Sequence, residues 1–175
     1  SYRSGLNSDC LLSCFDSNKK FLFIRKNGKV VFRAMIRLTK GSYVGDRMRK
    51  KIQFADLSGA GKPKEEEGEE LVLFLERYYE KNLAYEEQDQ AVYLAFVAAK
   101  EKAKKLGARL VLSCYYQDDV KTKEYIKSNY YLYISKSKNG SQYLDSLYGE
   151  ASVSDSGDYS SNIFLLENKE QEVAA

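Results

Sequence analysis

Hydrophobic residues near the start of the chain fall into short stretches separated by polar turns. Residues 10–15 and 19–25 are two such stretches, and the polar residues 16–18 lie between them. Asn27 and Gly28 follow as a pair, and this dipeptide between apolar runs is a strong signal for a two-residue hairpin turn. The pattern therefore predicts a β-hairpin in the first part of the chain.

The second strand of this hairpin is predicted from Lys29 to Thr39. Its residues alternate so that one face is apolar throughout, whereas the other face carries Arg33 and Arg37. Two arginines on one strand face indicate either a half-solvated surface or a binding site for an anion, such as a phosphate of a ligand or of nucleic acid. Arg33 and Arg37 are therefore the candidate anion-binding residues.

The regular pattern stops after Thr39 and returns at Glu70. The intervening stretch is rich in charged residues and glycine, and its part from 56 to 70 is predicted to be a mobile loop. Residues 70–79 (ELVLFLERYY) are enriched in valine and aromatic residues, which favours a strand, although leucine and glutamate would also tolerate a helix. Glu76 lies in this predicted strand.

The strongest periodicity in the chain predicts a helix from Glu87 to Leu106. Apolar residues recur there at three- and four-residue spacing, at Val92, Ala95, Phe96, Ala99, Ala103 and Leu106. Gly107 follows at once, and glycine is the residue that most readily takes the left-handed conformation that ends helices. Gly107 is therefore predicted to cap this helix.

The last third of the chain is predicted to add two more strands after a second helix. Residues 108–116 form a buried strand in this prediction, and residues 118–129 form a shorter polar helix with acidic residues at its start and Asn129 as its left-handed stop. Further strands are expected at 130–137 and 161–168. Hairpin, strand, helix, strand, helix and two strands together indicate an α/β (α+β) domain with a mixed sheet.

Length and composition favour one folded domain. With 175 residues, of which 43% are hydrophobic, the chain can bury a single core, so residues 1–175 are interpreted as one domain with a frayed tail at 169–175. No apolar run reaches the ~20 residues of a membrane span and the first residues lack a signal-peptide pattern, which predicts a cytoplasmic protein without membrane contact. A start at Ser1 rather than Met is compatible with removal of a tag or with a fragment of a larger protein.

The absence of histidine narrows the possible chemistry. It excludes nucleophile pairs and metal sites that depend on histidine. Three cysteines are an odd number and indicate reduced thiols.

Two further stretches resemble ligand-binding motifs only in part. The acidic run at 65–70 lacks the spacing of a calcium loop, so we expect no metal site. SGAGKP at 58–63 lacks two positions of a phosphate-binding P-loop. The net charge of +3 predicts no strong general attraction to polyanions.

The order of elements over residues 10–137 is similar to the fold of GNAT acyltransferases, which transfer acyl groups from acyl-CoA to amines. Such a resemblance implies a mostly antiparallel central sheet flanked by helices. Residues 120–131 resemble the second-helix pattern of this family, in which a tyrosine precedes a Gly-Phe pair and a strand; here Asn129-Tyr130 replaces Gly-Phe. The resemblance implies that Tyr125 could reprotonate the CoA thiolate, and that Glu76 could act as general base.

The chain departs from this family at the donor site. GNAT enzymes hold the pyrophosphate of acetyl-CoA on a glycine-containing turn that opens the long helix. Residues 81–93 contain no glycine, and Glu86, Glu87 and Asp89 put negative charge at the helix start. Acidic groups stabilise a helix N-terminus but repel a pyrophosphate. Binding of acetyl-CoA is therefore not expected, and no other cofactor is predicted.

The favoured functional interpretation is a non-catalytic GNAT-like domain that serves as an interaction or regulatory module with a protein partner. The many tyrosines and phenylalanines support such a surface, because aromatic residues supply large contact areas. One alternative is an N-acyltransferase with a remodelled donor loop, in which Glu76 is the base and Tyr125 the acid. Another is a nucleic-acid-associated protein that uses local basic clusters, including RMRKK at 47–51.

Overall fold

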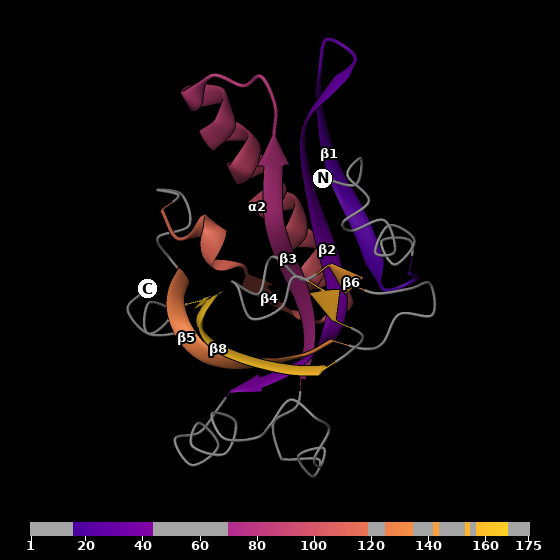
Figure 1. Cartoon of the computed structure of the whole chain (residues 1–175), viewed down its shortest axis with the longest axis vertical. Helices are drawn as coiled ribbons and strands as arrows, with labels where there is room; N and C mark the ends of the chain where they lie inside the picture. Colours follow the sequence, from indigo (N-terminus) through magenta and orange to yellow (C-terminus); the bar gives the residue numbers. More distant parts are fainter. Residues whose placement is uncertain are drawn as a thin grey trace.

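The computed structural model describes residues 16–43, 70–118, 125–134, 142–143, 153–154 and 157–167. These residues form β1 (Lys19–Lys26), β2 (Lys29–Tyr43), β3 (Glu70–Glu80), α2 (Tyr85–Leu106), β4 (Arg109–Leu112), the 3₁₀ turn η4 (Cys114–Tyr116), β5 (Tyr125–Ile134), β6 (Gln142–Tyr143), β7 (Val153–Ser154) and β8 (Gly157–Glu167). The described part is a mixed α/β fold with a helix against a sheet (Figure 1), which confirms the predicted class in its general form.

The predicted hairpin is confirmed as β1 and β2. Asn27 and Gly28 have φ angles of 50° and 76°, the left-handed values that a two-residue type I′ turn requires, so the dipeptide forms the turn for the reason its sequence suggested. Lys26 and Lys29 pair across it. The polar turn before β1 is also present, since the Lys19 amide donates a 3.0 Å hydrogen bond to the Asp16 carbonyl. In Figure 1 the hairpin tip extends beyond β3.

The predicted long helix is confirmed as α2, which starts at Tyr85, two positions before the expected Glu87. One stripe of its surface is buried, through Ala91, Val92, Ala95, Phe96, Ala99 and Ala103. Most of these are alanines, so the helix can approach the sheet closely. Gly107 ends the helix with φ 62°, and its amide donates to the carbonyls of the last turn. The predicted cap is therefore confirmed.

Substitution of Gly107 by alanine tests this cap. We expect Gly107→Ala to lower the free energy of unfolding by about 1 kcal/mol, because an L-residue in the left-handed region costs roughly that much. An added Cβ would meet nothing within 4 Å, so the penalty is conformational rather than steric. Urea denaturation measures it, and Lys102→Ala on the exposed side of α2 serves as the control. Equal stability of the two variants would contradict the prediction.

The six-stranded sheet has the order β1-β2-β3-β4-β8-β5. Among the strands that the structure describes, only β3 and β4 pair in parallel, and α2 connects them, as a parallel crossover requires. The helix covers one face of the sheet. The core beneath it includes Phe32 and Ile36 of β2, Leu73 and Leu75 of β3, and residues of β4 and β5. Burial of Phe32, at 1% exposure, confirms the apolar face predicted for the second strand.

The sheet also closes on itself. An additional pairing between β2 and β5, with Gly41 opposite Leu132, turns β2, β3, β4, β8 and β5 into a ring, and β1 extends it at one side. Figure 1 shows β5 and β8 curving together toward β2. Because side chains alternate along strands, Val72, Phe74, Val111, Tyr130 and Leu132 face the inside of the ring, away from α2; all five are buried. The domain thus has a second interior besides the core under α2.

A polar group joins three strands at one end of the ring. The Glu70 carboxylate of β3 accepts a 2.6 Å hydrogen bond from the Tyr130 hydroxyl of β5 and pairs with the Arg109 guanidinium of β4. A carboxylate that receives a charged and a neutral donor at once satisfies more of its lone pairs than either could alone. This link fixes the start of β3 between two strands that are distant in sequence.

The helix predicted at 118–129 is wrong over its second half, where residues from Tyr125 onward belong to strand β5. Asn129 is therefore not a helix stop but an interior position of a strand that pairs with β8 and β2. The segment YIKSNYYLYI is rich in aromatic and β-branched residues, which favour strands, and acidic residues at 118 and 119 do not outweigh that preference. β5 contains residues 130–134 of the strand predicted at 130–137, and β8 contains residues 161–167 of the strand predicted at 161–168; the remaining residues lie outside the described part of the chain.

Of the remaining predictions, two strands can be compared with the structure and three stretches lie outside the residues that it describes. The strand predicted at 108–116 is present but shorter, because β4 ends at Leu112 and η4 follows. The strand predicted at 70–79 is confirmed as β3. The apolar stretch at 10–15, the loop at 56–70 except Glu70, and the tail at 169–175 lie outside the described part of the chain.

Candidate functional site

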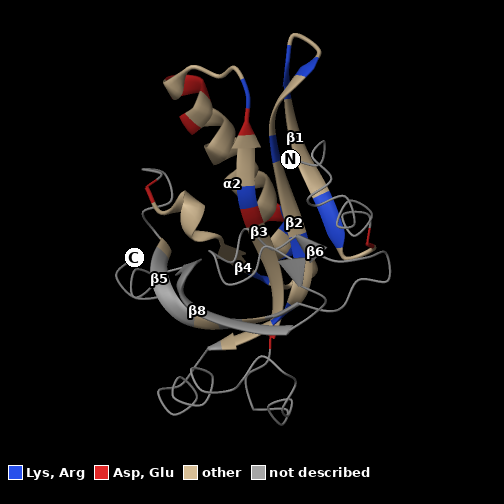
Figure 2. Ribbon diagram, viewed as in Figure 1, with Lys and Arg blue, Asp and Glu red and all other residues tan. Residues whose placement is uncertain are grey.

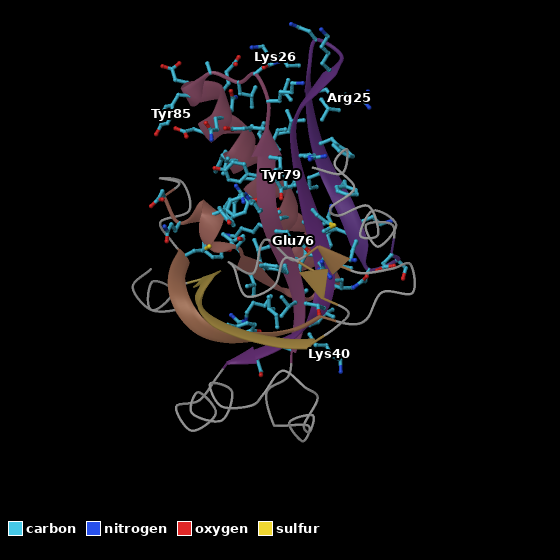
Figure 3. The ribbon with its side chains drawn as sticks, in the orientation of Figure 1. Arg25, Lys26, Lys40, Glu76, Tyr79 and Tyr85 are labelled. Carbon is cyan, nitrogen blue, oxygen red and sulfur yellow. The ribbon has the colours of Figure 1, made fainter. Side chains whose placement is uncertain are left out.

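Glu76 and Arg37, two of the residues singled out from the sequence, meet in the interior. The Arg37 Nε donates a 2.7 Å hydrogen bond to the Glu76 Oε1, and both side chains are almost completely buried, with 2% and 5% of their side-chain surface exposed. Figure 3 shows Glu76 in the body of the molecule, midway along β3. Glu76 is therefore an interior residue of the sheet and does not face solvent. The anion that faces Arg37 is a carboxylate of the same chain.

A β-bulge in β3 brings Glu76 to this position. Ile36 pairs with Leu75 and Ala34 with Tyr78, so two residues of β3, Glu76 and Arg77, lie opposite one residue of β2. Bulges redirect side chains and release backbone groups from the ladder. The released main-chain carbonyl of Glu76 accepts a 3.1 Å hydrogen bond from the buried Tyr116 hydroxyl, so the bulge leaves this carbonyl satisfied.

A second buried cation lies beside the ion pair. Lys19 of β1 is opposite Arg37 in the ladder, is 5% exposed, and forms a 3.1 Å salt bridge with Asp16. Burial lowers the pKa of Lys19 below its usual 10.5, and the positive charge of Arg37 lowers it further, whereas Asp16 and Glu76 act in the opposite direction. The buried Lys19, Arg37 and Glu76 and the partly buried Asp16 therefore form one electrostatic group.

Tyr125 lies on the other side of the sheet. It is the first residue of β5, is 7% exposed, and packs edge to face against Phe96 of α2 with ring centroids 5.4 Å apart. Leu73 and Leu75 face the same core, whereas Glu76 contacts Arg37 on the opposite face. The structure therefore brings Arg37 and Glu76 together and does not bring Tyr125 to them.

The N-terminus of α2 is capped by the side chain of Glu87, a residue of its own first turn. Ala84 is the N-cap, and its amide donates a 3.1 Å hydrogen bond to Oε2 of Glu87, the third residue of the helix. The other oxygen of Glu87 pairs with Lys26 at the hairpin tip. Glu86 adds a further negative charge in the first turn. Figure 2 shows this acidic helix start facing the basic hairpin tip. The arrangement suits a carboxylate and opposes a phosphate at this helix end.

Glu87 provides a direct pH test of this contact. The hydrogen bond from Lys26, and next that from the Ala84 amide, lower the pKa of Glu87 below its ordinary 4.5. A carboxyl with a lowered folded-state pKa adds stability above its unfolded pKa, and this contribution is lost as the pH falls through the folded value. We expect the carboxyl carbon of Glu87 to titrate below 4.5 by NMR, and Lys26→Met to move that midpoint upward. An unchanged midpoint would refute the contact.

Beyond the buried ion pair, the same face of the sheet becomes exposed and carries what we call the aromatic–arginine row: Phe23, Arg33, Tyr79, Arg77 and Tyr115. Phe23 pairs with Arg33 across β1 and β2, and Arg33 pairs with Tyr79 across β2 and β3. The Arg33 Cζ lies 5.0 Å from the centre of the Tyr79 ring. The Arg77 Cζ lies 5.5 Å from the Tyr79 ring centre and 4.3 Å from that of Tyr115. Aromatic rings and guanidinium groups thus alternate across three strands and η4.

The aromatic–arginine row contains rings that are exposed to solvent and guanidinium groups that are held by neighbouring side chains. Phe23 is 55% and Tyr79 37% exposed, whereas Arg77 is half-buried and donates a 3.3 Å hydrogen bond to the Tyr115 hydroxyl. Phe21 stacks on Phe23 with ring centroids 5.6 Å apart and extends the aromatic surface along β1. Cation–π contacts hold guanidinium groups in place while leaving their edges able to donate hydrogen bonds.

A pocket lies at one end of the row. Its volume is about 300 Å³, and it is lined by Arg77, Tyr78, Tyr79, Glu80, Gln88 and Tyr115. The pocket lies beside the last four residues of β3, past the carboxyl end of the parallel strand β4. Ligands commonly bind at the carboxyl ends of the strands in α/β sheets. The pocket is open there because β4 pairs with β3 only as far as Leu75.

Sequence reasoning identified Arg33 but missed the other members of the row. The alternation in β2 placed Arg33 on the correct face, and it placed Arg37 on the same face without showing that Arg37 is buried. Alternation in β1 would have put Phe21 and Phe23 on one face as well. No local pattern could show that Tyr79, Arg77 and Tyr115 join them, because that depends on strand register and on the bulge.

Among the described residues, no group of three or more cysteine, aspartate and glutamate side chains is placed to hold a metal ion. No helix in the described ranges combines the length and apolar character that a membrane crossing requires. Comparisons with protein-family models, with curated proteins and with solved structures found no match to this chain. We therefore infer function from the residues and geometry of the site.

Proposed function

We propose that this chain is a GNAT-like domain without acyl-transfer chemistry that acts as an interaction or regulatory module. The observation that carries this proposal is the buried Arg37–Glu76 ion pair. A general base needs a free lone pair and access to a substrate proton, whereas Glu76 is 4% exposed and accepts a hydrogen bond from a guanidinium. Glu76 therefore has a structural role in this proposal.

The surroundings of Tyr125 support the same conclusion. A tyrosine that reprotonates a leaving thiolate must present its hydroxyl to the acyl-donor site. Tyr125 packs against Phe96 in the core under α2, on the face opposite to Glu76. A base and an acid on opposite faces of one sheet cannot act on the same reacting atoms. The acidic start of α2, closed by Glu87, adds a third argument against a conventional pyrophosphate site.

The GNAT-like part of the proposal rests on the order of elements. A hairpin, a strand, a long helix and a parallel strand follow one another from β1 to β4, in the order expected of that family. The family's second helix does not continue through Tyr125, because β5 begins there. The proposed likeness is therefore confined to the region from β1 to β4.

The N-acyltransferase alternative is favoured by one observation, the pocket beside the carboxyl ends of β3 and β4. Arg77 could bind an acidic group there, and Tyr115 or Tyr79 could supply a hydroxyl. Glu76 could act as a base only after separation from Arg37. Breaking a buried pair of this kind costs roughly 3–5 kcal/mol, which makes the alternative the weaker one.

Thermal shift and calorimetric titration with acetyl-CoA and with free CoA test the two interpretations. A ligand at about a hundred times its dissociation constant stabilises a protein by roughly 2.7 kcal/mol. We expect no shift at millimolar CoA. A clear shift would overturn the proposal, and loss of that shift in Arg77→Gln, but not in Lys104→Gln on the exposed end of α2, would locate the donor in the pocket.

A further inference from the structure

The charge of the β1–β2 hairpin differs from that of the whole chain. The chain contains 28 basic and 25 acidic residues. From Lys19 to Tyr43, however, every charged residue is a lysine or an arginine. Arg25 and Lys29 are exposed at the hairpin tip, and Lys20 is exposed near the start of β1. Figure 2 shows basic residues at the tip and along these two strands. Lys19, Lys26 and Arg37 pair with carboxylates, so the attraction of the hairpin for a polyanion rests on its other basic residues.

The basic hairpin is continuous with the aromatic–arginine row. Phe21 and Phe23 project from the face of β1 that carries the row, and Arg33 lies beside Phe23 on β2. Figure 3 places Tyr79 on β3 between Glu76 and the level of Arg25 and Lys26. An exposed sheet face thus presents stacked rings, ordered guanidinium groups and a basic edge within one surface.

We propose that this face binds single-stranded nucleic acid. Proteins bind single strands with exposed aromatic side chains on which bases stack and with cationic groups that follow the phosphates. Phe21 and Phe23 provide the stacking surface, because their rings are exposed. Arg33 is exposed and is held by its contact with the Tyr79 ring, so it supplies the cationic group for a phosphate. The inference rests on the proposed function, in which the domain binds rather than catalyses, and it names the partner.

A single strand fits this surface better than a duplex or a protein. Bases in a duplex are stacked on one another, so their faces cannot reach Phe21 and Phe23. A protein partner would need acidic groups opposite the hairpin and apolar groups opposite the rings, whereas a single strand supplies charge and flat rings at every nucleotide. The pocket lined by Tyr79, Arg77 and Tyr115 lies at the end of the row, next to this surface.

Fluorescence anisotropy with a labelled 12-nucleotide DNA strand tests the proposal by measuring the dissociation constant. The same measurement is made with an RNA strand of the same sequence and with the matching DNA duplex. We expect the single strand to bind in preference to the duplex. Phe23→Ala should weaken binding by roughly 5- to 100-fold, the loss of one stacked base. Arg33→Gln should reduce the slope of log K against log salt by about 0.7, which corresponds to one phosphate contact.

Matched controls come from the opposite side of the domain. Leu94→Ala removes an exposed apolar side chain and Lys104→Gln an exposed charge from α2, and both should bind as the unmodified chain does. Three results would each overturn the inference. The single strand does not bind at 50 mM salt, the duplex binds equally well, or the Phe23→Ala and Arg33→Gln proteins bind as the unmodified chain does. If the oligonucleotide does not bind and CoA gives no thermal shift, the binding inference is wrong but the proposed non-catalytic function is retained. If CoA stabilises the protein, the proposed function is wrong, whether or not the oligonucleotide binds.

Discussion

Replacement of Glu76 by glutamine should lower the free energy of unfolding by about 3 kcal/mol or more. The substitution keeps the shape of the side chain but removes the charge that faces Arg37 in the interior. Loss of one partner of a buried ion pair typically costs roughly 3–5 kcal/mol, because the remaining charge stays buried without full compensation. Glu76 also favours the charged form of the nearby Lys19 and so partly opposes the lowering of its pKa by burial. Without the charge of Glu76, the buried cations Lys19 and Arg37 would have Asp16 as their nearby carboxylate.

Urea denaturation followed by circular dichroism measures this effect. Glu80→Gln is a matched control, since Glu80 is an exposed glutamate four positions further along β3. We expect the control to change stability by less than about 0.5 kcal/mol. The double variant Arg37→Met/Glu76→Leu should lose less than the sum of its single variants, because it removes both charges together. A loss below about 1 kcal/mol in Glu76→Gln would show that the pair is solvated, and would reopen the role of Glu76 as a general base.

Phe96→Ala should destabilise the domain by about 3–5 kcal/mol. Phe96 is 3% exposed and lies between α2 and the sheet, where its ring meets Tyr125 of β5 edge to face and lies 6.5 Å from that of Tyr93. Truncation of a buried phenylalanine loses its transfer free energy and leaves a cavity. A typical domain has a total stability of roughly 5–15 kcal/mol, so this single change should remove much of it.

Thermal and urea unfolding of Phe96→Ala should therefore show a lower midpoint, with Tyr85→Ala as the control. Tyr85 belongs to the same helix but is 78% exposed, and Figure 3 shows it at the helix start, away from the sheet. Tyr125→Phe keeps the ring that packs on Phe96, so it should cost much less than Phe96→Ala. A stability of Phe96→Ala equal to that of Tyr85→Ala would mean that α2 does not pack on β5 in solution.

Local signals predicted several elements well. Asn27-Gly28 specified the hairpin because its two residues tolerate positive φ angles, and Gly107 specified the helix end for the same reason. The apolar stripe of α2 is a property of the helix repeat itself, so it needed no knowledge of the sheet. The mixed α/β class follows from these elements and is confirmed in that general form.

The error at residues 118–129 has an identifiable cause. Acidic residues at the start and Asn129 at the end are typical helix boundaries, but they describe only the ends of a segment. The interior from Tyr125 onward prefers a strand, and pairing with both β8 and β2 satisfies its backbone hydrogen bonds. Tyr125 consequently lies in the core rather than at an acyl-donor site, a difference that changes its proposed role.

The sequence by itself determined where the chain turns, where its long helix begins and ends, and which face of β2 is apolar, because these depend on backbone preferences and on repeats within one segment. Only the tertiary structure decided that Arg37 is buried while Arg33, four residues away on the same strand face, is exposed. Burial of Arg37 requires Glu76 from another strand, placed opposite it by the register and the bulge of β3. Contacts between residues about 40 positions apart come from strand pairing, so a repeat within a single strand cannot reveal them.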